Sequence, residues 1–259
     1  MAISLASLQQ RQINLPPRIL VYGVAGIGKT TLAACAPAPV FLPTEDGLGR
    51  LDVVAFPQAK KFTDVLDAMD ALLVEPHNFE SFVIDSLDWL EPLVWAEVCQ
   101  RQKVNAMEDL TYGKGYMFAL DLWREYIGRL NRLRAEKGML ILQLAHAVIR
   151  RFDSPEHEPY DRYDIKLHQK AAALLVEHSD CVLFANYRVS TTKSDVGFNK
   201  KVTRAVGDCA RLLFTSERPA FLAKNRYNLP GEMPMEWPTL EAHLTSQTSA
   251  TNDTQPVQA

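Results

Sequence analysis

The chain has 259 residues, a net charge of −3 and 47% hydrophobic residues. This length is enough for one large domain or two small ones with a full hydrophobic core. The near-balance of 28 basic and 31 acidic residues excludes a polybasic, histone-like protein, although a local basic patch can lie within a neutral total. The four cysteines, at positions 35, 99, 181 and 209, form no CxxC pair, so neither a zinc ribbon nor a thioredoxin-like redox site is expected.

The two ends of the chain differ from its middle. Residues 1–17 are polar and end in two prolines, which predicts a flexible N-terminal arm. Residues 245–259 have no apolar periodicity, which predicts a disordered tail after one domain over residues 18–244. The sequence has no signal-peptide pattern, and no apolar run reaches the roughly 18 residues of a membrane span, so we expect a cytoplasmic protein.

Short apolar runs alternate with helical patterns over the first 147 residues. Apolar residues recur at helical spacing in segments such as 62–74, whereas the continuous apolar runs are typical of buried strands. This alternation predicts an α/β fold with a mostly parallel sheet flanked by helices. The expected strands are 18–22, 40–42, 53–56, 81–84 and 138–145, and the expected helices are 29–36, 62–74, 87–104 and 117–133.

The pattern changes after residue 147. Residues 148–165 are charged and contain proline and aspartate, so we expect a long loop, followed by a helix over 167–178. The remaining apolar runs predict strands that form C-terminal β hairpins. These strands are expected at 181–189, 201–203, 211–215 and 220–223.

A glycine-rich segment follows the first predicted strand and opens a predicted helix. It matches the pattern G-x-x-x-x-G-K-[ST], whose backbone N–H groups and helix N-terminus form an anion site for nucleotide phosphates. Lys29 is expected to reach the β- and γ-phosphates of ATP. The predicted nucleotide-binding residues are Gly23, Val24, Ala25, Gly26, Ile27, Gly28, Lys29, Thr30 and Thr31.

A second acidic position completes a predicted magnesium site. Asp85 ends the apolar strand over 81–84, and ligands of an open parallel sheet lie beyond the carboxyl ends of its strands. We therefore expect Thr30 and Asp85 to hold Mg²⁺ beside the phosphates, with Asp85 in the role of the Walker B carboxylate. An aspartate that only caps the next helix is the other interpretation.

The position of the general base separates P-loop classes. Many AAA-type ATPases carry a glutamate directly after the Walker B aspartate, whereas here the next residue is Ser86. The segment that ends in Glu45 and Asp46 resembles the RecA-like core ATPases, in which an acidic residue at a strand end positions the attacking water. By that resemblance Glu45 is the general base, with Asp46 as the alternative.

Two further motifs extend the resemblance. In RecA-like proteins a polar residue at the end of the corresponding strand senses the γ-phosphate. In this chain the expected strand is 138–145, so His146 is the first candidate for that sensor and Gln143 is the second. The segment Lys224-Asn-Arg226-Tyr is similar to the Lys-Asn-Arg-Phe-Gly motif of the RadA branch. That similarity implies that Lys224 and Arg226 reach the nucleotide of a neighbouring subunit in a ring or filament.

Taken from residue 18 to 240, the chain resembles the phage-encoded RecA-like nucleotide-binding proteins, which are grouped with Sak-type single-strand annealing recombinases. The resemblance implies a RecA-like P-loop NTPase core and a Mg²⁺-dependent ATPase stimulated by DNA. It also implies binding of single-stranded DNA in phage recombination, by annealing or strand exchange, together with a single-strand-binding protein.

Two segments are candidates for contact with DNA. The first is the expected loop over 148–166, where cations and aromatic residues interleave in a mixture suited to single strands. The second is the stretch 187–226, which has nine basic and three acidic residues and carries a charge of +6. Its candidate contacts lie near Gly197, where we expect a flexible hairpin tip, and are Asn199, Lys200, Lys201 and Arg204. A subunit interface lined by these cations is the other interpretation of this stretch.

Two other functions fit parts of the sequence. A P-loop kinase for a small molecule would use an arginine-rich lid, which Arg150, Arg151 and Arg162 could form. A non-catalytic protein would bind ATP only to control its assembly. Phosphate transfer to a metabolite would identify the kinase, and tight ATP binding without turnover would identify the assembly protein.

Overall fold

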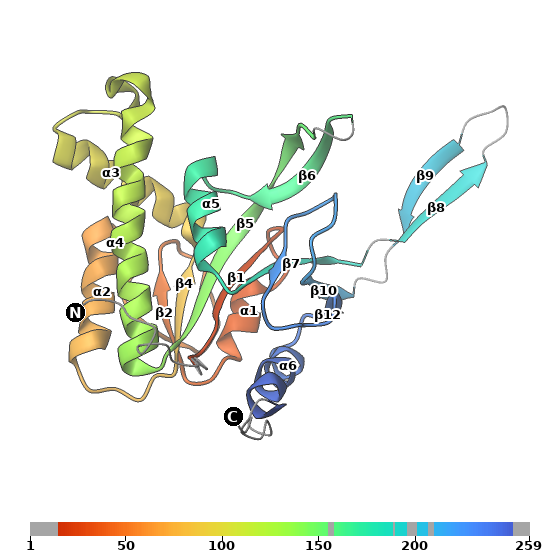
Figure 1. Cartoon of the computed structure of the whole chain (residues 1–259), viewed down its shortest axis with the longest axis horizontal. Coiled ribbons are helices and arrows are strands. Elements are labelled where there is room, and N and C mark those ends of the chain that lie inside the picture. The colour runs from red at the N-terminus through yellow and green to blue at the C-terminus, as the bar shows by residue number, and fades with distance from the viewer. Residues whose placement is uncertain (1–14, 155–157, 189, 196–200, 207–209, 251–259) are drawn as a thin grey trace, which may run out of the picture.

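The computed structural model describes residues 15–154, 158–188, 190–195, 201–206 and 210–250, with only the backbone described for 190–195, 201–206 and 246–250. A ten-stranded sheet forms the centre of the molecule, and the strand order along its main path is β12-β10-β7-β1-β5-β4-β2-β3 (Figure 1). Among the described helices none is both long and apolar enough to cross a membrane. The strands of the main path are β1 (Arg18–Gly23), β2 (Pro39–Pro43), β3 (Val54–Ala55), β4 (Ser81–Asp85), β5 (Leu140–Phe152), β7 (Cys181–Tyr187), β10 (Arg211–Phe214) and β12 (Glu232–Pro234).

Helices cover both faces of the sheet, and the sheet divides the hydrophobic core into two clusters. One cluster packs under four helices: α2 (Phe62–Val74), α3 (Leu87–Gln102), α4 (Lys114–Lys137) and α5 (Gln169–His178). The other packs under α1 (Lys29–Ala34) and α6 (Trp237–Ala250). Two short 3₁₀ turns, at 107–109 and 111–113, join α3 to α4. The mixed α/β class with a mostly parallel sheet is therefore confirmed.

The register of the parallel strands sets the position of the site. β1 lies between β5 and β7, and Gly23 at its end pairs with His146 on one side and with Ala185 on the other. β4 lies on the far side of β5, and its Asp85 pairs with Leu144 and with Pro43 of β2. The carboxyl ends of β1, β2, β4 and β5 therefore meet at one edge of the sheet, where open α/β sheets bind ligands.

The expected loop over 148–165 is wrong, because β5 continues to Phe152 and residues 160–165 form another strand. The first half of β5 is buried between β1 and β4, and the second half extends beyond the main path of the sheet and pairs with β6 (Tyr160–Ile165) in an antiparallel hairpin. Cross-strand aromatic and cationic contacts stabilise this hairpin: Phe152 and Tyr160 lie 5.5 Å apart, and the Arg162 guanidinium lies 4.2 Å from the Phe152 ring. Charged residues on an exposed hairpin look like a loop in the sequence.

Several elements near the C-terminus also differ from expectation. Residues 220–223 form no strand of their own, and the short strand β11 is Lys224–Asn225. Helix α6, which we did not expect, reaches Ala250, so the first residues of the predicted tail are helical, and residues 251–259 lie outside the described range. The hairpin of β8 (Ser190–Asp195) and β9 (Lys201–Val206) agrees with the expected late hairpins and projects from the main body in Figure 1. Residues 1–14 of the predicted arm lie outside the described residues.

Candidate nucleotide-binding site

The glycine-rich loop joins β1 to α1, and two of its glycines are required by geometry. A Cβ on Gly23 would lie 2.2 Å from the carbonyl oxygen of Ala185 in β7, so the two strands approach too closely for a side chain. Gly28 caps α1 with φ 103°, a left-handed backbone that side chains disfavour. The loop between them therefore has the curled backbone that the sequence pattern predicts for a phosphate cradle.

The lysine and the hydroxyl of this loop contact groups at the same edge of the sheet. Lys29 is buried, and its Nζ donates to the carbonyls of Gly23 and Val24 at 3.2 Å each. Thr30 Oγ1 donates to Asp85 Oδ2 at 2.7 Å, which brings together the two predicted magnesium ligands. Burial lowers the pKa of Lys29 and raises the pKa of Asp85. Both pKa shifts arise because an isolated charge is costly to bury. A bound nucleotide and its cation would offset this cost for Lys29 and Asp85.

A pocket of about 390 Å³ opens beside the loop and brings the predicted residues together. Most of the predicted catalytic and binding side chains lie on its wall, although they come from four different strand ends. Asp46, Lys224 and Arg226 are not among its lining residues. The predicted residues that line it are Gly26, Gly28, Lys29, Thr30, Thr31, Glu45, Asp85 and His146.

The two acidic candidates for the general base differ in position. Glu45 is half-buried on the wall of the pocket, and its Oε1 accepts a 3.0 Å hydrogen bond from the Ser86 hydroxyl. Asp46 is exposed and lies outside the lining. The geometry therefore favours Glu45 over Asp46.

The two sensor candidates are also separated. His146 lies at the end of the sheet-bound half of β5 and lines the pocket. Gln143 is fully buried in the core, where its Oε1 accepts a 3.2 Å hydrogen bond from the Tyr126 hydroxyl. Only His146 therefore lies where it could face a bound nucleotide.

Asp88, for which the sequence predicts no role, connects this site to the β5–β6 hairpin. Its carboxylate accepts hydrogen bonds from the Ser86 hydroxyl at 2.9 Å and from the His146 N–H at 2.9 Å, and it lies 3.6 Å from Lys166 Nζ. Burial opposes ionisation of this carboxyl, but the hydrogen bonds from His146 and Ser86 outweigh burial and lower its pKa to about 2. The only signal in the sequence was an acid three residues after Asp85, in the first turn of a helix.

Arg211 was counted in the basic stretch but was not predicted at the site. Its guanidinium extends from β10 and donates to the Ile27 carbonyl at 3.4 Å. A Cβ on Gly28 would lie 2.6 Å from Arg211 Nη1, so the arginine lies directly against the phosphate loop. No sequence pattern could find this contact, because it depends on the antiparallel pairing of β10 with β7.

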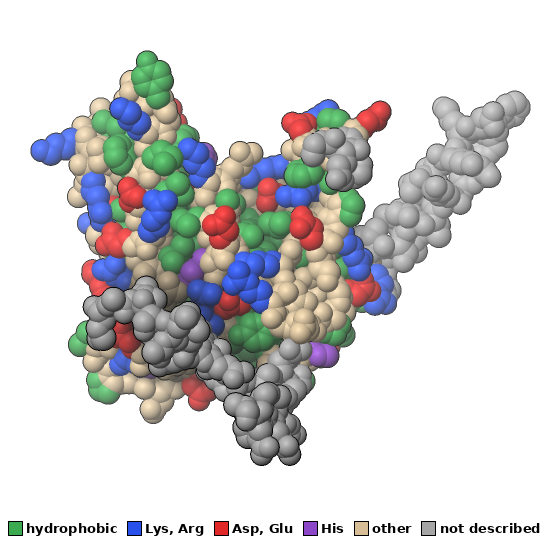
Figure 2. All heavy atoms as spheres, viewed as in Figure 1, with side chains coloured by type: hydrophobic (Ala, Val, Ile, Leu, Met, Phe, Trp, Pro, Cys, Tyr) green, Lys and Arg blue, Asp and Glu red, His purple; other side chains and the backbone are tan. Residues whose placement is uncertain are grey.

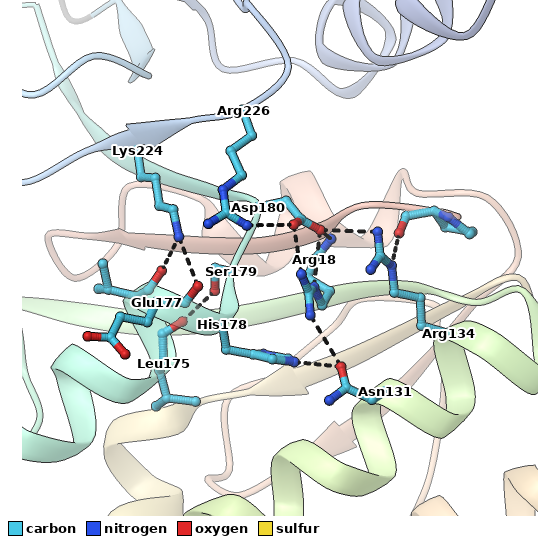
Figure 3. A network of polar contacts seen from close by, with 12 residues as sticks. Arg18, Asn131, Arg134, Leu175, Glu177, His178, Ser179, Asp180, Lys224 and Arg226 are labelled. Atoms are coloured by element: carbon cyan, nitrogen blue, oxygen red, sulfur yellow. Dashed lines mark hydrogen bonds and ion pairs between the residues drawn. The ribbon is translucent and has the colours of Figure 1, made fainter. Parts of the chain in front are cut away.

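Lys224 and Arg226 lie at the opposite edge of the sheet. The strand β11 pairs with the first residues of β7, at the amino ends of the parallel strands. Lys224 Nζ donates to the carbonyls of Val176 and Glu177 at the end of α5, and Arg226 lies 3.5 Å from Asp180 (Figure 3). Within one chain these two cations therefore belong to a separate cluster and not to the nucleotide pocket.

That cluster is centred on the carboxylate of Asp180. Arg18 contacts it with its backbone N–H and its guanidinium at 2.8–3.1 Å, and Arg134 lies 3.3 Å away (Figure 3). Burial acts against ionisation of Asp180, but the hydrogen bonds from Arg18 outweigh it and lower the pKa. Burial also lowers the pKa of His178 to about 4, so its imidazole is neutral at physiological pH. The cluster ties the starts of β1 and β7 together.

The oxygen atoms at the pocket suit Mg²⁺. This ion prefers oxygen ligands and is usually bound through one or two protein groups together with substrate phosphates. Thr30 and Asp85 supply such oxygens, 2.7 Å apart and beside the buried Lys29. The described residues contain no cluster of three or more His, Cys, Asp or Glu side chains that could hold a metal by themselves.

Comparison with known proteins gives one family and two distant similarities. A protein of Bacillus subtilis (strain 168), the "SPbeta prophage-derived uncharacterized protein YorG", is 24% identical over 174 residues, which cover 64% of this chain and 49% of that protein. The matched part thus spans about half of that relative. A crystal structure of the RadB recombinase is 14% identical, with a TM-score of 0.44 over 84% of this chain and 86% of that chain. The profile of the AAA domain family matches residues 15–227, a range that contains the phosphate loop, Asp85 and His146. The chain therefore belongs to the AAA domain family, a family of P-loop ATPases.

Proposed function

We propose that this chain is an ATPase that binds ATP with Mg²⁺, uses water to hydrolyse the bond between the β- and γ-phosphates, binds single-stranded DNA and acts in phage recombination within the host cytoplasm. The observation that carries the proposal is the pocket in which Lys29, Glu45 and Asp85 meet. The AAA domain match supports the ATPase assignment, and the prophage-derived relative supports the phage origin. Annealing or strand exchange, as the resemblance to Sak-type recombinases implies, is the reaction that ATP would drive.

Nucleotide binding in this proposal uses the curled loop and its lysine. The backbone N–H groups of residues 23–31 and the N-terminus of α1 bind the phosphates, and Lys29 turns from the Gly23 and Val24 carbonyls toward them. Thr30 and Asp85 would hold Mg²⁺, which supplies positive charge to the phosphate oxygens when it is bound. Arg211 adds a cation at the outer side of the loop.

Hydrolysis in this proposal requires a carboxylate that orients the attacking water. Glu45 is the acidic side chain on the pocket wall that is not paired with Thr30, and the Ser86 hydroxyl holds its Oε1. The same hydroxyl lies 2.9 Å from Asp88, and its single proton can serve only one of the two carboxylates at a time. Glu45 is thus released toward water when Ser86 donates to Asp88, while His146 faces the γ-phosphate.

Single-stranded DNA in this proposal contacts the β5–β6 hairpin. Figure 2 shows a notch between this hairpin and the end of α3 and α4, with basic and acidic side chains mixed around it. Phe152, Tyr160 and Arg162 give the hairpin the combination of rings and cations that single strands require. The side chains of Lys201 and Arg204 in the second candidate segment, and the expected hairpin tip with Asn199 and Lys200, lie outside the described residues.

Assembly into a ring or filament would give Lys224 and Arg226 a second role. In one chain they bind the end of α5 and Asp180, at the edge opposite the pocket. A neighbouring subunit whose pocket faces that edge would present its phosphates to these cations, and a single-strand-binding protein would supply the DNA. Support for this part comes from the resemblance of the motif alone.

ATP turnover with and without a single-stranded oligonucleotide tests the proposal. We expect slow hydrolysis by the wild-type protein, stimulation by DNA at low salt, and loss of both in Glu45→Gln. Because phosphate contacts make DNA binding salt-dependent, the titration is repeated over several salt concentrations. Phosphate transfer to a small molecule, or tight ATP binding without turnover in any condition, would contradict the ATPase mechanism. Absence of DNA binding at low salt with ATP present would contradict the DNA assignment.

A further inference from the structure

A second pocket, of about 450 Å³, lies between α3 and the base of the β5–β6 hairpin. Two tryptophans of α3, Trp89 and Trp95, form one wall, and residues 166–168 form the other. Trp89 is 49% exposed, although a large aromatic side chain is normally covered by the core. Trp95 packs edge-on against Tyr116, whose ring stacks on His168 at 4.1 Å. The pocket thus has one open aromatic side chain on a wall that is fixed by ring contacts.

Two cations flank this open ring. The Lys166 side chain is 58% exposed, and the Arg150 side chain is 29% exposed. Arg150 Nη2 donates to the Leu167 carbonyl, which fixes the guanidinium, while its Nη1 is buried and lies 3.8 Å from Asp164 Oδ2. Lys166 therefore offers donors to an anionic ligand at the surface, and the partly exposed Arg150 adds positive charge beside it.

The carboxylates that line this pocket already accept hydrogen bonds from other groups of the protein. The Asp88 side chain is only 1% exposed and accepts the hydrogen bonds from Ser86 and His146. Glu91 is buried, and both of its oxygens accept the His168 N–H, at 2.9 and 3.0 Å. The His168 imidazole adds no charge at neutral pH, because burial lowers its pKa. The face open to solvent thus combines a tryptophan with two cations, while the carboxylates lie beneath it.

We propose that this pocket binds one nucleobase of single-stranded DNA, with Trp89 stacking on the base and Lys166 and Arg150 binding the adjacent phosphates. A ring that stacks on any base and cations that follow the backbone are the elements of sequence-tolerant single-strand binding. This inference rests on the proposed function and gives the DNA a specific site, at the base of the hairpin and separate from the rings of Phe152 and Tyr160.

The position of the pocket links it to the nucleotide site. Lys166 lies 3.6 Å from Asp88, whose carboxylate also accepts the Ser86 hydroxyl that holds Glu45. A phosphate that binds Lys166 competes with Asp88 for this ammonium group. Asp88 then depends more on Ser86 and His146 for its hydrogen bonds, and the Ser86 hydroxyl is drawn away from Glu45. Occupation of the pocket therefore favours the arrangement in which Glu45 is free to orient water.

The test uses the full chain with ATP and two probes of equal length, an oligo(dT) and an abasic strand that has the same phosphates without bases. We expect Trp89→Ala to weaken oligo(dT) binding roughly tenfold, Trp89→Phe to retain most of it, and neither to change binding of the abasic strand. Val74→Ala is the control, because Val74 is 81% exposed at the end of α2, lines neither pocket and should leave both affinities unchanged. Lys166→Ala should reduce the salt dependence of binding to both probes by about one phosphate contact.

The outcomes separate this site from the proposed function. Wild-type binding of oligo(dT) with an unchanged affinity in Trp89→Ala overturns the pocket and leaves the DNA assignment intact. Equal losses on oligo(dT) and on the abasic strand overturn the stacking role. A change of oligomeric state in Trp89→Ala at unchanged DNA affinity would make a second copy of the chain the occupant and overturn the proposal. Failure of the wild type to bind either probe overturns both the DNA assignment and this site. Unchanged ATP affinity shows that each variant is folded.

Discussion

The backbone N–H of His146 donates a 2.9 Å hydrogen bond to Asp88, which joins the end of the sheet-bound part of β5 to the first turn of α3. The imidazole Nδ1 of His146 lies 3.0 Å from the same carboxylate. Asp88 also accepts a hydrogen bond from the hydroxyl of Ser86, the residue that follows β4. One buried carboxylate therefore contacts both the end of β4 and β5 at the candidate site. This junction is a fixed part of the fold and couples the nucleotide pocket to the hairpin.

Replacement of the Asp88 carboxylate should lower the free energy of unfolding and weaken the link between the nucleotide pocket and the hairpin. In Asp88→Asn we expect a loss of about 1–3 kcal/mol in the free energy of unfolding at pH 7, measured with urea, because a charged acceptor of buried N–H groups is removed. The pKa of about 2 lies below the ordinary value, so this stabilisation is present above pH 4 and is lost as the pH falls toward 2. The exposed Asp121→Asn serves as a control and should change stability little. Equal stability of Asp88→Asn and wild type at pH 7 would contradict this role.

Removal of the charge of Glu45 should stop hydrolysis without stopping binding. We expect Glu45→Gln to reduce ATP turnover by roughly 100-fold or more, since general-base catalysis contributes about that factor, while the affinity for ATP stays near that of the wild type. Asp46→Asn is the matched control, because Asp46 is the adjacent acid and lies outside the pocket lining. If Asp46→Asn lost turnover and Glu45→Gln kept it, the assignment of the base would be reversed.

The sequence predicts those parts of the site whose residues are consecutive or end an apolar run, and it does not predict contacts between residues far apart in the chain. The phosphate loop was predictable because its glycines, lysine and threonine are consecutive and lie between a strand and a helix. Asp85 and His146 were predictable because each ends an apolar run, and parallel strands bring such ends to one edge. Asp88 and Arg211 were not given roles, because Asp88 contacts His146 from 58 residues away and Arg211 contacts Ile27 from 184 residues away.

A side chain at Gly23 should destabilise the whole sheet. A Cβ there would lie 2.2 Å from the Ala185 carbonyl oxygen, which is backbone and cannot rotate away. We expect Gly23→Ala to lower the free energy of unfolding by about 1–3 kcal/mol, as overpacking usually does. Gly128→Ala is the matched control, because Gly128 lies within α4 with open space around it. There alanine should stabilise by about 0.5–1 kcal/mol, since it favours a helix more than glycine does. Thermal unfolding of both variants measures the two opposite signs.

The buried Glu91 predicts a pH dependence of stability. Burial raises the pKa of Glu91 to about 6, so the folded state binds a proton more readily than the unfolded state. The stabilisation from that proton is present below pH 4.5, the ordinary value, and is lost as the pH rises through about 6. We therefore expect the free energy of unfolding, relative to Glu91→Gln, to rise by about 1 kcal/mol between pH 8 and pH 5. A pH-independent difference between the two proteins would show that Glu91 keeps its ordinary pKa.

The two roles of the Lys224–Arg226 segment can be separated by mixing subunits. Arg226→Ala should lose an ion pair with Asp180, which is a modest loss because the Arg226 side chain is 55% exposed. If Arg226 also completes the site of a neighbour, Arg226→Ala and Lys29→Ala subunits should each be inactive alone and regain ATP turnover when mixed. We expect this recovery, measured as phosphate release. No recovery, with folded subunits on both sides, would limit Arg226 to its contact with Asp180.

The hairpin shows why the charged half of the chain was harder to predict. Its strands carry Arg151 and Asp161 on exposed positions, and the exposed Asp153 follows β5 directly, a composition that is typical of loops. The pairing that makes them strands comes from partners eight or more residues apart, such as Phe152 with Tyr160. Helix α6 had a signal in the sequence that was not used, because Trp237, Leu240 and Leu244 recur at helical spacing, and in the structure all three pack in the second core cluster.

The continuity of β5 has a consequence for the entropy of ligand capture. A flexible loop over residues 148–165 would have to become ordered when it bound a ligand, and each ordered residue would oppose binding by about 1–2 kcal/mol of chain entropy. Here β5 runs from the centre of the sheet to Phe152 as one unbroken element, and β6 is already paired with its second half in register from Ala147 to Phe152. Most of this ordering therefore occurs when the protein folds, and a partner of the hairpin meets a pre-organised surface.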